Sequence, residues 1–292
     1  MTKARAATSI TVAVAIISFT LATTDVAAWG PQGHRLVALL ATEHLTPAAR
    51  ENVVWLIGPE TLPDVASWAD GYLQGNFQTS FWHYVNIPAD ASSYDRNRDC
   101  PHQPGVASGS AADRWRDCVV DRIPYHEERL ANTALDRADR AIALKFLVHF
   151  VGDLHQPYHA LGVERGGNGI LLSVFGHSEC GDDPARRRTC NLHEVWDGAL
   201  IAHRQLDDAA YRRLLRELIR KNGWTVDSPG STVDWAMESK RIATKALLAQ
   251  QGIVDETYYR AHIGEIDQRL AQGGLRLAAL LNRSLKSSPP HQ

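Results

Sequence analysis

The stretch ANTALDRADRAIALKFLVHFVGDLHQ, residues 131–156, contains no glycine or proline before Gly152, and its apolar residues recur at helical spacing. It predicts a long helix at the centre of the fold. Its end, HFVGDLHQPYHA, residues 149–160, is rich in histidine. On a helix His149 and Asp153 share one face, with Cβ atoms about 5–6 Å apart, and can converge on one ion. Because Pro157 breaks the helix, His159 comes from the turn beyond it.

The same four-residue spacing recurs in NLHEVWDGA, which contains His193 and Asp197. One such pair also fits a capped, solvated helix end, but two pairs beside apolar residues are improbable by chance. Further ligand-type side chains are Asp70 in SWADGYL, His83 in FWHYVN and His34 in GPQGHR. Imidazole and carboxylate groups are zinc ligands, so these segments predict a metal site.

Helical signals dominate the remaining sequence. Thr46 and Pro47 are typical of a helix N-cap and first helical residue, and Gly58 ends that helix. A helix carrying SWAD is expected to begin near Asp64. Further helices are expected over about 207–221 and 232–251, with one or two more between 255 and 285.

Only GILLSVFG, residues 169–176, is typical of a strand. Long loops are expected at 86–124 and 162–192, and loops of that length usually carry function or disulfides. We therefore predict a mainly α fold, a single compact multi-helix domain with one short β-hairpin or strand and long disulfide-bearing loops.

The N-terminus, MTKARAATSITVAVAIISFTLATTDVAA, has the parts of a secretory signal peptide. Two basic residues precede an apolar run that ends near Ala22, and small residues precede Ala28. The run is shorter than the ~20 apolar residues of a membrane anchor and lacks a stop-transfer flank. Removal of residues 1–28 would leave residues 29–292 as one secreted or periplasmic domain, beginning at Trp29.

The four cysteines are even in number in a chain expected to be exported, which favours two disulfides over metal ligands or nucleophiles. Three pairings are possible, of which we predict Cys100 with Cys118 and Cys180 with Cys190, each closing a loop. The formal net charge of −2 excludes a strongly basic protein that coats phosphates. No helix shows a sustained heptad seam. We expect a monomer with no protein partner and no stable membrane association.

The motifs WGPQGH, SWAD, WHYVN, HFVGDLHQPYH, GGN and NLHEVWD occur in the order found in one family. The sequence resembles the trinuclear-zinc, single-strand-specific nucleases and 3′-nucleotidases of fungi, plants and bacteria, which share their helical fold with bacterial zinc-dependent phospholipase C. The resemblance spans residues 29–197. It implies three Zn²⁺ ions and an endonuclease that hydrolyses single-stranded DNA and RNA to 5′-phosphorylated products, with 3′-nucleotides as further substrates.

The resemblance also assigns ligands to three zinc sites. The first would be formed by Asp70, His83, His149 and Asp153. The second would be formed by His159, His193 and Asp197. The third would be formed by the amino group and carbonyl of Trp29, by His34 and by a bridging Asp153. An uncleaved precursor has an amide at Trp29 and could not chelate in the same way.

By the same resemblance, Asp70 orients the attacking hydroxide, and Asp153 bridges two ions that clamp a water. Tyr84 would stack on a nucleobase, Asn86 would hydrogen-bond to the edge of that base, and Asn168 would contact the substrate near the metals. Core packing is the alternative for Tyr84, and a simple β-turn is the alternative for the glycines before Asn168.

Two departures from the family pattern affect substrate contacts. Several relatives have aspartate where Asn86 stands, and some carry a basic residue shortly after Asp70, where this chain reads Gly71-Tyr72-Leu73. The arginines at 186–188 are alternative phosphate contacts, against a solvated loop. His155 has no family role and points away from His149 at helical spacing, so it is expected either to support the ligand residues or to be structural.

Two other functions remain open. Phospholipase C enzymes of similar fold use glutamate at the last ligand, where this chain has Asp197. A non-catalytic zinc-binding module would usually close each zinc with four protein ligands. Two of the sites implied here have only three protein residues each and leave room for water, which favours catalysis.

Overall fold

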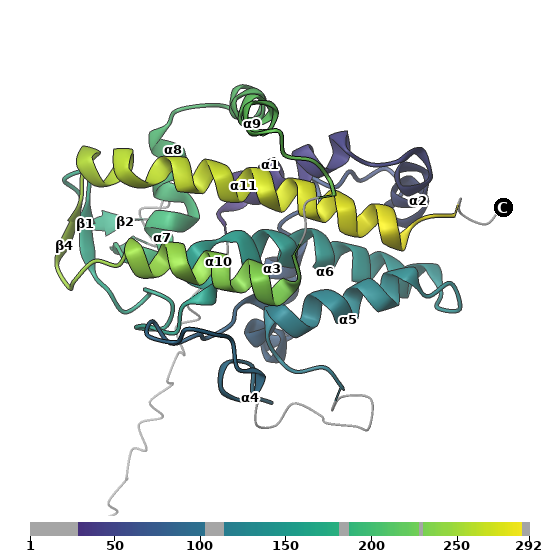
Figure 1. Cartoon of the computed structure of the whole chain (residues 1–292), viewed down its shortest axis with the longest axis horizontal. Coiled ribbons are helices and arrows are strands. Elements are labelled where there is room, and N and C mark those ends of the chain that lie inside the picture. Colours follow the sequence, from purple (N-terminus) through teal and green to yellow (C-terminus); the bar gives the residue numbers. More distant parts are fainter. Residues whose placement is uncertain (1–28, 103–113, 181–186, 228–229, 288–292) are drawn as a thin grey trace, which may run out of the picture.

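Helix α6 (Arg137–His155) lies at the centre of the fold (Figure 1). The computed structural model describes residues 29–102, 114–180, 187–227 and 230–287. The Asp136 side chain caps α6 by accepting a hydrogen bond from the Asp139 amide at 2.7 Å. Every residue from Phe146 to His155 is buried, because other helices pack around this half of α6. The predicted central helix is confirmed, although it begins after a turn at 132–136.

The other helical segments are mostly short. They are α1 (Pro31–Glu43), α2 (Pro47–Ile57), α3 (Trp68–Tyr72), η1 (Phe77–His83), α4 (Arg96–Asp99), α5 (Val119–Ala131), η3 (Pro157–Ala160), α7 (Leu192–Glu194), η5 (Val195–Ala199), α8 (Leu200–His203), α9 (Asp208–Asn222), α10 (Thr232–Lys245) and α11 (Glu256–Ser284). Helices α1, α2, α3, α5, α10 and α11 contact α6. The longest, α11, runs along the upper side of the molecule, with α9 above it (Figure 1).

Several predicted boundaries differ from the structure. The SWAD helix begins at Trp68 and not near Asp64, because the Asp64 carboxylate accepts hydrogen bonds from the Thr61 amide and hydroxyl and closes a turn. Helix α10 ends at Lys245, before the turn that leads to the last strand.

Helices α1 and α5 were not predicted from the sequence. The range 86–124, expected to be a loop, contains α4 and the start of α5. Pro124 lies inside α5 and argues locally against a helix, but α5 packs along α6 and buries Val119, Ile123 and Leu130. Tertiary packing has outweighed the local preference of the chain.

The strands are short and form two pairs among the described residues. β1 (Leu172–Val174), within the predicted 169–176 segment, pairs in parallel with β4 (Gly252–Val254), and β2 (Glu179–Cys180) pairs antiparallel with β3 (Arg188–Thr189). Both predicted disulfides are confirmed, with Cα–Cα distances of 5.4 Å for Cys100–Cys118 and 4.9 Å for Cys180–Cys190.

The fold is a mainly helical single domain, as predicted. The disulfides are consistent with export. The predicted signal peptide, residues 1–28, lies outside the described residues. Within the described part of the chain, no helix combines the length and apolar character needed to cross a membrane.

Candidate functional site

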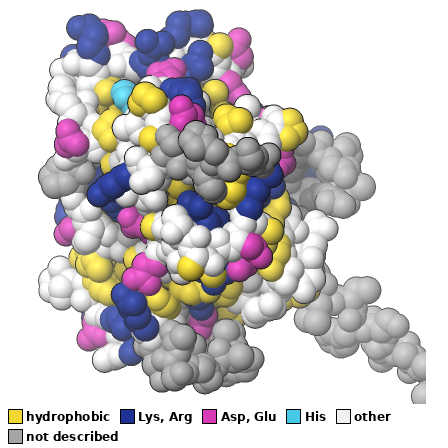
Figure 2. All heavy atoms as spheres, turned by 90° about the vertical axis from the view of Figure 1, so that its right-hand side faces the viewer, with side chains coloured by type: hydrophobic (Ala, Val, Ile, Leu, Met, Phe, Trp, Pro, Cys, Tyr) yellow, Lys and Arg dark blue, Asp and Glu magenta, His cyan; other side chains and the backbone are white. Residues whose placement is uncertain are grey.

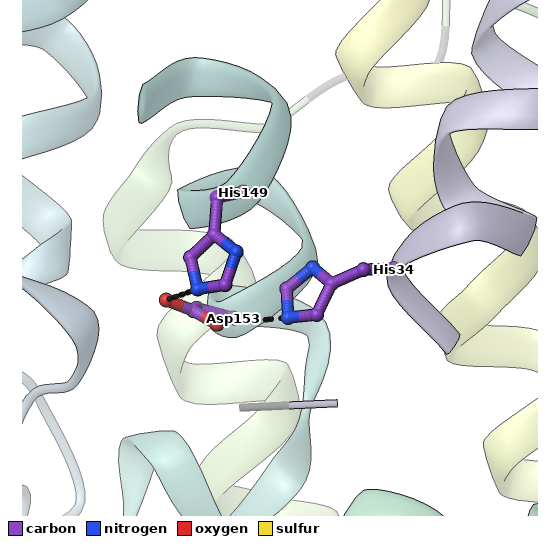
Figure 3. Close-up of side chains that lie close together, drawn as sticks. All are labelled: His34, His149 and Asp153. Atoms are coloured by element: carbon purple, nitrogen blue, oxygen red, sulfur yellow. Dashed lines mark ion pairs between the residues drawn. The ribbon is translucent and has the colours of Figure 1, made fainter. Parts of the chain in front are cut away.

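Helices α6 and α1 bring His149, Asp153 and His34 together (Figure 3). The His149 Nε2 lies 3.3 Å from Asp153 Oδ2, and the His34 Nε2 lies 3.4 Å from Asp153 Oδ1. The His34 and His149 rings stack with centroids 4.0 Å apart. A Cβ atom at Gly152 would lie 2.6 Å from the His34 Nδ1, so only glycine at that position lets α1 approach so closely.

Asp70 of α3 and His83 at the end of η1 contact the same two side chains of α6, His149 and Asp153. The His83 Nδ1 lies 3.0 Å from Asp153 Oδ2 and 3.2 Å from the His149 Nε2. The Asp70 Oδ1 lies 3.2 Å from the same His149 nitrogen. All these side chains have no exposed surface except Asp70, of which 27% is exposed. Asp70 is therefore the carboxylate that solvent can reach.

A second cluster joins His159, His193 and Asp197. The His159 and His193 Nε2 atoms lie 3.1 Å apart, and the His193 Nε2 lies 3.5 Å from Asp197 Oδ2. Asp197 lies in η5, a π-helical turn, which widens the helix just after α7. Such turns occur frequently at functional sites. His159 Nδ1 lies 3.9 Å from Asp153 Oδ1, so the two clusters adjoin.

Backbone carbonyls orient three of these imidazole rings. The Nδ1 of His149 donates to the Ala66 carbonyl at 2.8 Å, that of His159 to the His83 carbonyl at 2.8 Å, and that of His193 to the Gly166 carbonyl at 2.6 Å. A carbonyl only accepts, so whenever one of these rings is neutral its Nε2 lone pair faces the cluster. Two facing lone pairs, as on His159 and His193, repel unless a cation lies between them.

The residues present fit a metal ion. Several buried polar atoms of the first cluster form no hydrogen bond with any described residue. These are both ring nitrogens of His34, Nε2 of His83, Oδ1 of Asp70 and both carboxylate oxygens of Asp153. Leaving so many buried polar atoms unpaired is costly, and a bound cation would satisfy the oxygens and nitrogens that face each other. Nitrogen and oxygen ligands at this density suit Zn²⁺.

A third group with metal-ligand spacing, Cys100, Cys118 and Asp121, does not qualify. Its cysteines are joined in a disulfide, and a metal-binding cysteine must be a free thiolate.

Trp29 is fully buried at the start of the described chain. The Gly30 amide that follows it donates to the Asp197 carbonyl at 2.7 Å. A Cβ atom at Gly33 would lie 2.9 Å from the Trp29 Cβ, so the first turn of α1 folds tightly over this residue. The same turn carries His34, which places the backbone of Trp29 close to the His34 and Asp153 cluster.

A pocket of about 500 Å³ opens beside the second cluster, and His193 forms part of its wall. The three residues predicted to contact substrate, Tyr84, Asn86 and Asn168, all line it. Tyr84 is only partly buried, which does not support the core-packing alternative. The Asn168 amide donates to the Arg165 carbonyl at 3.0 Å within its own turn.

The GGN turn depends on its glycines. Gly166 and Gly167 have φ angles of 66° and 83°, and a Cβ atom at Gly166 would lie 2.7 Å from the Tyr158 carbonyl oxygen. Both the turn and the close approach therefore require glycine.

The model of the S1/P1 nuclease family matches residues 29–286. The chain belongs to the S1/P1 nuclease family. It is 28% identical over 286 residues to nuclease P1 of Penicillium citrinum, covering 87% of this chain and 97% of that protein. It is 31% identical over 296 residues to endonuclease 4 of Arabidopsis thaliana, covering 90% and 91%. Endonuclease 2 of the same plant is 28% identical over 277 residues, covering 87% and 90%.

Membership in the S1/P1 family makes nucleic acid the expected class of substrate and hydrolysis the expected reaction. The buried histidine and aspartate clusters are the candidate metal sites of this S1/P1 chain.

Sequence reasoning missed some residues of the S1/P1 site. Gln156 is fully buried, donates from Nε2 to Asp197 Oδ1 and accepts from the Tyr158 amide. It lies within the quoted motif, but a glutamine between two histidines gives no signal of its own. Arg165 lines the pocket, and its place follows only from the folded loops.

The arginines at 186–188 are the alternative phosphate contacts that the sequence suggests. Arg186 lies outside the described residues, and Arg187 is exposed. Arg188 lines the pocket and forms an ion pair with Glu194.

The pKa values of two carboxylates of this S1/P1 site are shifted in opposite directions. Burial opposes the charge of Asp153, but His149, His34 and His83 outweigh it and lower its pKa well below the usual value. Burial raises the pKa of Asp197 well above the usual value, although the hydrogen bond from Gln156 opposes this. Metal ligands bind in their deprotonated form, so a cation bound at Asp197 would favour its ionised form.

Proposed function

We propose that this protein is an exported zinc-dependent endonuclease that hydrolyses single-stranded DNA and RNA to 5′-phosphorylated products. The observation that carries the proposal is the position of His193, which belongs to a buried metal-ligand cluster and also forms part of the wall of the pocket containing Tyr84. A phosphate whose nucleoside occupies that pocket would lie next to the cluster.

The proposed zinc ligands form three sets. One zinc would be held by Asp70, His83, His149 and Asp153. A second would be held by His159, His193 and Asp197. A third would be held by Trp29, His34 and the shared Asp153. The unpaired buried atoms of the first cluster support the first and third sets.

Signal removal before Trp29 belongs to the same proposal, because the third zinc would require its free amino group. The family match beginning at residue 29 and the burial of Trp29 support residues 29–292 as the mature nuclease domain. The mature protein is proposed to act as a secreted or periplasmic monomer.

Bound zinc would lower the pKa of coordinated water and would stabilise negatively charged oxygen. The chain contributes position and orientation. Asp70, partly exposed beside the buried Asp153, would accept a hydrogen bond from the attacking water and direct its lone pair at phosphorus. The pKa of Asp153 is lowered, so its carboxylate stays charged and can accept hydrogen bonds where the two clusters adjoin.

Tyr84 would stack on a nucleobase, and Asn86 would hydrogen-bond to the edge of that base. Stacking tolerates every base, and it requires a base free of its partner strand, so this arrangement favours single strands with little sequence preference. Asn168, at the rim of the same pocket, would contact the sugar and phosphate.

A pocket of about 500 Å³ is also large enough for one nucleotide. The same site would therefore remove the 3′-phosphate of a mononucleotide, because the 3′ oxygen is the leaving group in both reactions.

The deciding experiment is cleavage of single-stranded DNA, RNA and phosphatidylcholine by the processed protein, before chelation, after chelation and after zinc is restored. Zinc-dependent release of 5′-phosphorylated nucleotides is expected. Cleavage of lipid alone would replace the proposal with a phospholipase C, and inactivity on all three substrates would favour a binding module. Metal analysis of the untreated protein would count the ions.

A further inference from the structure

A second and larger hollow lies away from the metal clusters, between α1, α2 and α9. Its volume is about 1020 Å³. Part of its lining is apolar, from Leu39, Pro63 and Ile219. The charged residues around it are Glu43, Arg50, Arg212, Arg213, Arg216, Glu217 and Arg220. We call this hollow the arginine groove.

The arginine groove concentrates positive charge on a chain whose formal net charge is −2. Five arginines line it against two glutamates. Four of the five come from α9, and Figure 2 shows Lys and Arg side chains gathered at the top of the molecule, where α9 lies in Figure 1. The pocket at the metal clusters is lined by two arginines, Arg165 and Arg188.

Ion pairs occupy three of the four arginines of α9, since Arg220 pairs with Glu217 of the same helix and Glu43 lies beside two others. Arg212, Arg216 and Arg220 follow one another at four-residue spacing, and like charges at that spacing destabilise a helix by a few tenths of a kcal/mol per pair. Glu43 contacts two of them, with distances of 3.4 Å to the Nε atoms of Arg212 and Arg216. Arg213 is exposed and forms no ion pair with any described residue.

Helix α1 connects the arginine groove to the metal clusters. His34 lies near its start, whereas Leu39, Thr42 and Glu43 at its end line the groove. Nine residues separate His34 from Glu43, which is roughly 14 Å along the helix axis at about 1.5 Å per residue. A single-stranded nucleic acid advances about 3.4 Å per nucleotide, so a dinucleotide is too short to span this distance, whereas a longer oligonucleotide can span it.

We propose that the arginine groove binds the phosphate backbone of a single-stranded nucleic acid some nucleotides away from the bond being cleaved. The proposal rests on the proposed nuclease function and adds a binding site outside its catalytic pocket. Guanidinium groups bind phosphate oxygens in pairs of hydrogen bonds, and an arginine without an ion-pair partner is free to do so. Among the described residues, His44 is the one ring side chain that lines the groove and no Phe, Tyr or Trp does, so the groove is suited mainly to contacts with the backbone.

The test compares the zinc-loaded protein with its Arg213→Ser/Arg216→Ser variant on two substrates, the dinucleotide TpT and oligothymidylate of about 30 nucleotides. Both substituted residues are exposed, so the variant is expected to fold. For the long substrate we expect KM to rise on the order of tenfold at 0.1 M salt with kcat unchanged, and the salt dependence of log kcat/KM to weaken by about 1.4 for two lost contacts. Kinetics on TpT should not change.

The matched control is Arg241→Ser/Lys245→Ser on α10, which removes the same charge from exposed positions that line neither hollow. An equal rise of KM in this control would overturn the proposal, because total charge would then explain the effect. Unchanged KM in the groove variant would also overturn the proposal. So would a groove variant that no longer binds phosphatidylglycerol vesicles but cleaves the oligonucleotide with unchanged kinetics. If the unaltered protein cleaves neither substrate, it is the proposed function that fails.

Discussion

Two fully buried histidines of α6, His149 and His155, lie in opposite electrostatic surroundings. Each donates its Nδ1 hydrogen to a backbone carbonyl, of Ala66 and Val151 respectively. The Nε2 of His149 then faces carboxylates, whereas the Nε2 of His155 lies 3.0 Å from the Arg276 guanidinium. The pKa of His149 is raised to about 9, since Asp153 and Asp70 outweigh its burial. Burial and nearby arginines lower the pKa of His155 well below the usual value.

On one side of α6 a histidine, His149, is thus a candidate metal ligand. On the other side a histidine, His155, is a hydrogen-bond acceptor for Arg276. On the side of His155, the Glu238 carboxylate binds both Arg269 and Arg276, which are almost fully buried. In that cluster Glu238 pairs with both guanidinium groups, and of these three side chains only the Nε of Arg276 is a buried polar atom without a hydrogen bond to a described residue. The His149 cluster leaves several oxygen and nitrogen atoms of neighbouring side chains without hydrogen bonds to described residues, and one bound cation would satisfy those that face each other.

The largest expected effect is on the metal side of α6. Asp70→Asn keeps the shape of the side chain but removes the charge that orients the attacking water, so kcat/KM on single-stranded DNA should fall by about 10²- to 10⁴-fold. The melting temperature should change little. The matched control, Asp64→Asn, alters an exposed turn carboxylate, and its activity should equal that of the unaltered protein. Full activity of Asp70→Asn would remove its assigned role.

On the His155 side of α6, where Glu238 pairs with Arg269 and Arg276, the corresponding change is Glu238→Gln. It leaves two buried guanidinium groups without a counter-charge, so the free energy of unfolding should fall by about 3–5 kcal/mol. Urea denaturation measures this change, and zinc content and kcat at low temperature should stay unchanged. A loss of bound zinc without a loss of stability would show that the two sides of α6 are not independent.

Gln156→Leu tests the support of the second cluster. Without the amide donor, Asp197 loses the hydrogen bond that holds one of its oxygens, and zinc affinity should fall by about 10- to 100-fold. Competition with a zinc chelator gives the affinity. Gln272→Leu is the control, because its Oε1 accepts from Arg269 on the other side of α6. Equal zinc affinities in both variants would contradict the role of Gln156.

The smallest effect concerns His126, a buried histidine that stacks on Phe146 of α6 with centroids 4.5 Å apart. Burial lowers its pKa well below 6.5, with Arg122 and Arg129 acting in the same direction. A lowered histidine pKa gives stability that is complete above pH 6.5 and is lost as pH falls below it, by up to about 1.4 kcal/mol per pH unit.

His126→Phe should therefore flatten the loss of stability between pH 6.5 and 5 relative to the unaltered protein. Melting curves of both proteins across this range, with EDTA present in every sample, measure the difference. Identical slopes would show that His126 does not titrate on unfolding.

Local sequence patterns determined a large part of this protein. The four-residue spacings of His149 with Asp153 and of His193 with Asp197 predicted both pairs, because residues one helical turn apart face the same way whatever surrounds them. The disulfides close short loops, which is also a local choice. The ordered motifs indicated the family before any geometry was known.

Only the tertiary structure decided which distant segments these local elements pack against. It joined α1 to α6 through the gap left by Gly152, paired β1 with a strand some eighty residues later, and formed α5 despite Pro124. It also set the arginines of α9 around one groove. These outcomes depend on burial and charge between segments distant in the chain, and a pattern of neighbouring residues contains no information about which distant surface will cover it.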